Sequence, residues 1–122
     1  MILSVLELIA SAVASASGLK VLRSFDVSTS VPMRTAVVSF LEARDVGSPN
    51  ESAPIFLEAF YSVVIAAEKI DKAFLSYIEN ASKAVKSLLT SQGYPVRIAS
   101  LNIAPQDGYY VATLNLAVRV NL

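Results

Sequence analysis

The longest stretch of the chain without a turn signal is Ser52–Gln92, where no glycine or proline follows Pro54. Ser52 suits a helix N-terminus, and Pro54 is tolerated in the first helical turn because the N–H that it lacks would be unpaired there. Gly93 and Pro95 form a stop signal just after the last apolar residues. The stretch therefore predicts one very long helix, of more than about 55 Å at roughly 1.5 Å per residue.

Numbered in sevens, this predicted helix has two apolar seams, and most of the flanking rows are apolar too. A surface helix needs an apolar stripe only a little over about 100° wide. We therefore expect the helix to overhang its own sheet and to pack against another chain, with a single wide core helix as the alternative. The residues predicted to form this interface are Phe56, Leu57, Phe60, Val64, Ala66, Asp71, Ala73, Phe74 and Ile78.

Asp71 is the polar exception on the inner seam. A carboxylate there needs a partner, or its pKa must rise. One interpretation is a position at the helix edge, or a pair with Lys72 or an arginine. A register-setting polar contact between chains is a second interpretation, and a catalytic acid is a third.

The composition excludes several classes of function. The chain has no cysteine and no histidine, which removes disulfides, thiolate catalysis, cysteine metal sites and every histidine-dependent triad. Ten basic and ten acidic residues leave a net charge of zero, without the basic excess typical of nucleic-acid binding. No phosphate-binding loop or nucleophile motif appears. We predict no catalytic, cofactor-binding or metal-binding residue, no cofactor, no small-molecule ligand and no nucleic-acid partner.

With 122 residues, the sequence predicts a single domain over residues 1–122. Its hydrophobic content is 54%, and its charged content of 16% compares with about 25% in ordinary domains. A chain this short buries only about two-thirds of its unfolded surface. Surplus apolar surface is therefore expected to be covered by a copy of the chain, a partner or a bilayer.

Met1–Ala16 is apolar apart from a narrow polar stripe of Ser4, Glu7, Ser11 and Ser15, which predicts an amphipathic helix. No lysine or arginine lies near the start, and Glu7 interrupts the apolar run, so the segment departs from a secretory signal. We interpret it as a core or interface helix. A signal or membrane-surface segment is the alternative.

Period-two alternation predicts a half-buried strand over Leu19–Ser30. Thr35–Arg44 is apolar on both parities, and its valine and threonine content favours a strand over a helix. Asp45–Ala53 is the clearest loop. Glu42, Arg44 and Asp45 form a polar cluster near the end of the second strand, interpreted as a solvated rim.

Two more strands are predicted after the long helix. Val96–Ala104 changes phase near Ala99–Ser100, which indicates a bulge or two apolar faces. A turn at Pro105–Gly108 leads to a last strand, Tyr110–Leu122, whose even-numbered residues are mostly apolar.

The predicted order is αββαββ. The simplest closure is an α+β two-layer sandwich, in which a four-stranded antiparallel sheet carries both helices on one face and the second helix is very long. This arrangement is ferredoxin-like with permuted connections.

The leading functional expectation is a non-catalytic structural or scaffold protein that forms homo-oligomers through apolar helix and sheet faces. The alternative is a membrane-proximal component of a pilus, secretion or envelope assembly, anchored by Met1–Ala16. A small-molecule binder or enzyme using carboxylate, tyrosine and lysine groups, and a nucleic-acid binder, are weaker candidates.

Overall fold

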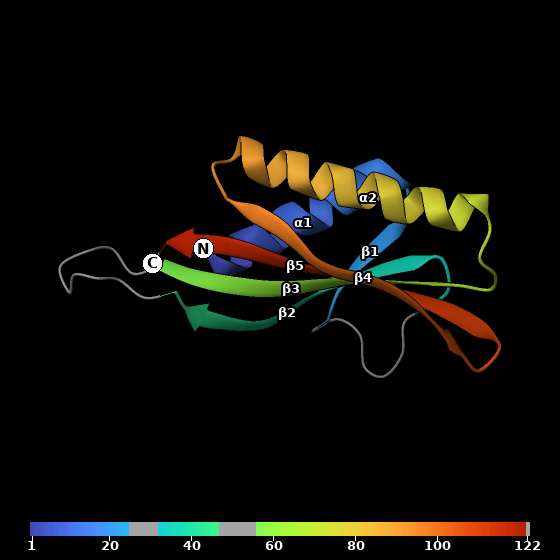
Figure 1. Ribbon diagram of the computed structural model, residues 1–122. Helices are drawn as coiled ribbons and strands as arrows, with labels where there is room; N and C mark the ends of the chain where they lie inside the picture. The colour runs from blue at the N-terminus through green and yellow to red at the C-terminus, as the bar shows by residue number, and fades with distance from the viewer. Residues whose placement is uncertain (25–31, 47–55, 122) are drawn as a thin grey trace.

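The computed structural model describes residues 1–24, 32–46 and 56–121. Figure 1 shows a layer of helices lying over one side of a twisted sheet. In chain order the elements are α1 (Ile2–Ser17), β1 (Lys20–Arg23), β2 (Thr35–Asp45), β3 (Phe56–Ala67), α2 (Lys72–Ser91), β4 (Val96–Gln106) and β5 (Tyr109–Asn121). The predicted α+β class is confirmed.

The sheet differs from the predicted one. Its described strands number five, in the order β1-β2-β3-β5-β4, and β1 runs parallel to β2 while all other neighbours are antiparallel. The predictions of a four-stranded, purely antiparallel sheet and of αββαββ order are therefore wrong. The additional strand is β3, which occupies the first half of the segment predicted as one long helix.

The segment Phe56–Ala67 forms the middle strand of the sheet, and nearly all of its residues on both faces are partly or fully buried. Tyr61, Val63 and Ile65 point into the core below the helices, while Ser62 and Ala66, on the alternate parity, are also buried. A continuous apolar run has no period that separates strand from helix. The aromatic and β-branched residues of Phe60–Ile65 were the available signal, since such residues favour a strand.

Asp71 is the N-cap of α2 and does not lie on an apolar seam. Its backbone is extended, and its carboxylate accepts a hydrogen bond of 2.9 Å from the backbone N–H of Phe74. An aspartate in this position satisfies an N–H that has no partner inside the helix. The helix therefore begins at Lys72, and it ends at Ser91, shortly before Gly93, whose φ is 85°.

The two helices share one hydrophobic core with the sheet. Val5, Ile9 and Val13 of α1 are fully buried, as are Val85 and Leu89 of α2. Both helices lie on the same side of the sheet (Figure 1), and their buried residues form one cluster with the helix-facing side chains of β2, β3 and β5. The buried side of α2 is thus covered by its own chain, so the expected overhanging helix is absent.

Helix α1 is amphipathic as expected, and its apolar side packs into this core. The hydroxyl of the fully buried Tyr61 donates a 2.8 Å hydrogen bond to the backbone carbonyl of Ile2, and burial raises the pKa of that hydroxyl. An ion pair between Arg23 and Glu7 joins β1 to the exposed side of α1. Neither helix in the described part of the chain has the length and apolarity needed to cross a membrane.

The remaining predicted strands are observed, with adjusted ends. Thr35–Arg44 is a strand, the register of β4 shifts between Ile98 and Ser100, and the even-numbered residues of β5 face the core. The predicted strand Leu19–Ser30 is described only as far as β1 and Ser24. Residues 25–30, most of the predicted loop Asp45–Ala53, and the predicted helix start at Ser52 and Pro54 lie outside the described residues.

Replacing Asp71 by alanine is expected to lower the free energy of unfolding by about 1 kcal/mol, because the N–H of Phe74 loses its capping acceptor. Asp71→Asn keeps a capping oxygen and should cost only a few tenths of a kcal/mol. Urea denaturation of both variants, followed by circular dichroism, measures the difference. Equal losses in the two variants would contradict the capping role.

Tyr61→Phe is expected to lower the free energy of unfolding by about 0.5–1.5 kcal/mol, because the variant keeps the buried ring but loses the hydrogen bond to Ile2. Tyr109→Phe, at a half-buried tyrosine in β5, is the control and should change stability by less than about 0.5 kcal/mol. Thermal unfolding of the two variants compares them.

Candidate interaction surface

The sheet has two unlike sides because successive side chains of a strand point to opposite faces. One side faces the helices and supplies the core, and we call the opposite side the outer face. No helix in the described residues covers the outer face (Figure 1). The part of it near the end of β2 and the start of β3 carries five charged residues, here named the charged face: Glu42, Arg44, Glu58, Arg97 and Arg119.

The β2 part of the charged face is held by two contacts of Arg44. Its guanidinium donates a 2.7 Å hydrogen bond to the carboxylate of Glu42, two residues earlier on the same side of the strand. Its Cζ atom also lies 5.2 Å from the centre of the Phe60 ring on β3, which is a cation–π distance. Both charged side chains are more than half exposed. Of the predicted polar cluster of Glu42, Arg44 and Asp45, the first two therefore form an exposed pair.

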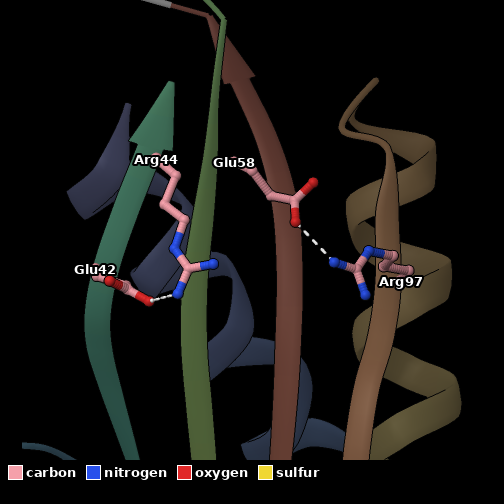
Figure 2. Close-up of polar contacts among 4 residues, drawn as sticks. All are labelled: Glu42, Arg44, Glu58 and Arg97. Atoms are coloured by element: carbon pink, nitrogen blue, oxygen red, sulfur yellow. Dashed lines mark hydrogen bonds and ion pairs between the residues drawn. The ribbon is translucent and has the colours of Figure 1, made fainter. Parts of the chain in front are cut away.

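The other part of the charged face crosses a strand. Arg97 on β4 donates a 2.7 Å hydrogen bond to Glu58 on β3, although β5 lies between the two strands (Figure 2). Arg97 is the register partner of Ala117 on β5, and Ala117 is the register partner of Phe60. The small side chain of Ala117 leaves room for the long arginine to cross β5. Sequence reasoning did not find this pair, because its residues are far apart in the chain.

Arg119 is the third cation of this surface. It is exposed, and it lies opposite Glu58 in the β3–β5 register. Within the described residues, its guanidinium has no hydrogen bond or ion pair. Together with Glu58, Arg97 and Ala117 it lines a shallow hollow of about 280 Å³. The charged face thus carries three guanidinium groups and two carboxylates, and it suits contact with another polar surface.

The two edges of the sheet are also exposed. At one edge, no described strand pairs with the outer side of β4, and Ile98 and Leu101 are 44% and 48% exposed. At the other edge, β1 pairs only with Thr35–Val38, so the described residues leave β2 open beyond that point. Phe40 and Leu41 on this open part are 38% and 55% exposed. Open edges with apolar side chains are sites where another strand pairs readily.

The residues predicted as an interface are divided between three places. Phe60, Val64 and Ala66 lie on the outer face of β3, while the exposed Phe56 and half-buried Leu57 begin that strand. Asp71 and Ala73 lie at the start of α2. Phe74 and Ile78 are buried in the core of the chain itself. The structure does not bring this set together on one surface, and its role in binding another chain stays a prediction.

Comparisons with known proteins bear on the fold. No family model and no curated protein matches the chain. Among solved structures, the chain is similar to a chain from the "Virion of native gene transfer agent (GTA) particle", with a TM-score of 0.50 and 16% sequence identity. The similarity covers 99% of this chain and 92% of that chain. At this identity the similarity shows a shared fold, over nearly the whole length of both chains.

The charged face is expected to contribute little to the stability of the isolated chain. Glu58→Gln, which removes the ion pair with Arg97, should lower the free energy of unfolding by less than about 1 kcal/mol, because Arg97 is largely exposed. Urea denaturation at low and high salt measures this effect. A loss of several kcal/mol would show that the pair is required for folding.

Proposed function

We propose that this protein is a non-catalytic structural subunit that assembles with copies of itself. The observation that carries the proposal is the exposure of both sheet edges and of the adjoining charged face, all on described residues. Exposed edge strands and uncovered apolar side chains favour association.

The predicted long helix does not support assembly. The first half of that segment is the central strand β3, and the buried side of α2 is covered within the chain. The apolar surface that remains available lies elsewhere, at the sheet edges and on exposed ends such as Leu3 of α1 and Leu75 of α2. The basis for assembly is therefore the sheet rather than a helix seam.

The shared fold supports the same proposal. The similar chain belongs to a virion particle, and a virion is an assembly of many subunits. We extend to this chain only the structural role and the assembly into a multi-subunit particle.

The membrane-anchored alternative has no observation in its favour. It depended on the apolar residues of Met1–Ala16, and the buried members of that set lie in the core beneath α1. The proposed function therefore places the partner at the sheet and assigns no membrane contact to α1.

Sedimentation or light scattering of the full chain at micromolar concentration tests the proposal. We expect a mass of several times 13.0 kDa. We also expect the mass to change with salt, because charged side chains adjoin the exposed edges. A monomer at every concentration and salt tested would overturn the proposal.

A further inference from the structure

Strand β4 is an edge of the sheet, since β5 is the one described strand that pairs with it. Edge strands are commonly protected by charged side chains. Arg97 is the only charged residue of Val96–Gln106, and its guanidinium is turned inward across β5 to Glu58 (Figure 2). The apolar side chains of Ile98 and Leu101 are left 44% and 48% exposed. The middle of β4 therefore lacks the usual protection against pairing with another strand.

The two internal stretches outside the described residues adjoin other strands. Residues 25–31 connect β1 to β2, and β1 is at the opposite end of the strand order from β4. Residues 47–55 leave the sheet at Val46 and return at Phe56, where the N–H of Val46 donates a 3.3 Å hydrogen bond to the carbonyl of Phe56. The middle of β4 is level with Ser62, six residues further along β3 and two strands across. Among the described residues, this part of the edge is open.

A bulge makes the apolar residues of the edge symmetric. Ile98 and Ser100 pair with adjacent residues of β5, so Ala99 is an additional residue in β4. The bulge shifts the alternation of side chains by one residue. Four apolar residues consequently lie on the helix-facing side, because their partners on β5 all belong to the core. Two precede the bulge and two follow it at matching distances: Val96, Ile98, Leu101 and Ile103.

The backbone of the edge has the same symmetry. The N–H of Arg119 donates a 2.9 Å hydrogen bond to the carbonyl of Pro95, and hydrogen-bonded pairs alternate with non-hydrogen-bonded pairs along an antiparallel ladder. Following this alternation along β5, the backbone groups of the same four apolar residues point away from β5, toward the open edge. The additional residue is taken up on the β5 side, so the four positions are evenly spaced. Pro105 comes next in the alternation, and pairing ends there because proline has no N–H.

We propose that β4 pairs antiparallel with β4 of a second copy, about a two-fold axis that passes through the bulge. Val96 of each copy then lies opposite Ile103 of the other, and Ile98 lies opposite Leu101. In this register every opposed pair shares one face of the sheet. A shift of two residues in either direction places a helix-facing residue opposite an outer-face residue at the centre, and a shift of one residue does so along the strand. The exposed Ile98 and Leu101 cover each other across the contact.

The charges are compatible with this register. Arg97 lies opposite Asn102 of the other copy, so no like charges are opposed, and the amide oxygen of Asn102 is an acceptor for the guanidinium. A two-fold contact of this kind is closed and joins two copies only. A larger assembly then needs a second contact elsewhere on the chain. This inference rests on the proposed self-assembly and specifies one contact surface.

Disulfide trapping tests the contact, and the chain has no native cysteine to interfere. The double variant Arg97→Cys/Asn102→Cys should form a covalent dimer under mild oxidation, seen on a denaturing gel without reductant. Within one chain the two positions pair with residues four apart on β5, a distance of roughly 13 Å, which is too far for an internal disulfide. Each single variant should stay at the mass of one chain.

The matched control is Ser76→Cys/Asn102→Cys, with Ser76 on the exposed side of α2. It should stay at the mass of one chain, because the two positions are not opposed in the proposed contact. Absence of the covalent dimer from the Arg97/Asn102 variant overturns the proposal. A series of larger covalent multimers also overturns it, since that result requires a head-to-tail contact. So does dimer formation by Asn102→Cys alone, which requires another register.

A charge placed within the contact gives an independent measurement. Leu101→Lys sets an ammonium group opposite Ile98 of the other copy, and it should weaken association at least about tenfold in a dilution series followed by light scattering. Leu75→Lys on α2 is the control, since Leu75 is also 48% exposed, and it should associate like the unmodified chain. Equal association of the two lysine variants would contradict the contact.

The outcomes separate this inference from the proposed function. A monomeric unmodified chain overturns both. An unmodified chain that associates, with no covalent dimer and no effect of Leu101→Lys, overturns only the β4–β4 contact. Circular dichroism of each variant confirms that it is folded. Leu101→Lys decides the contact if the double cysteine variant does not fold.

Discussion

The pairing of β3 with β5 is the constraint on which the rest of the structure depends. The two strands align without a register shift from Phe56 opposite Asn121 to Ala67 opposite Tyr110. This pairing places the core-facing residues of both strands, such as Tyr61 and Leu116, on the one side that α1 and α2 cover. Because the period of side chains in a strand is two, a slip of one residue would turn this set to the outer face. The core therefore exists only in this register.

The same pairing creates the outer face and fixes the order of its charges. Glu58 and Arg119 become neighbours only because β3 and β5 are aligned, and Arg97 reaches Glu58 only because Ala117 lies between them. A surface of this kind adds little to the stability of the chain, since exposed ion pairs are worth about 1 kcal/mol or less. In the proposed assembly, such an arrangement of charge would give specificity to a contact.

The sequence predicted the elements that carry a clear local signal. The alternation along Tyr110–Leu122, the stop at Gly93 and the amphipathic pattern of Met1–Ala16 correspond to β5, the end of α2 and α1. The polar cluster at Glu42 and Arg44 was also visible in the sequence. The prediction of one long helix was wrong because a strand with two apolar faces does not alternate between polar and apolar residues. The two-residue period of β3 is therefore not visible in the sequence. Asp71 was the sequence signal for the start of α2, since aspartate favours a helix N-cap.

By itself, then, the sequence determined an α+β chain with an apolar surplus and with neither cysteine nor histidine. Only the tertiary structure decided that β3 joins β2 to β5 and that Arg97 lies beside Glu58. Only the structure also shows that Glu42 and Arg97 share one row across the sheet. The physical reason is that period and composition act over a few residues, whereas strand order joins residues far apart in the chain.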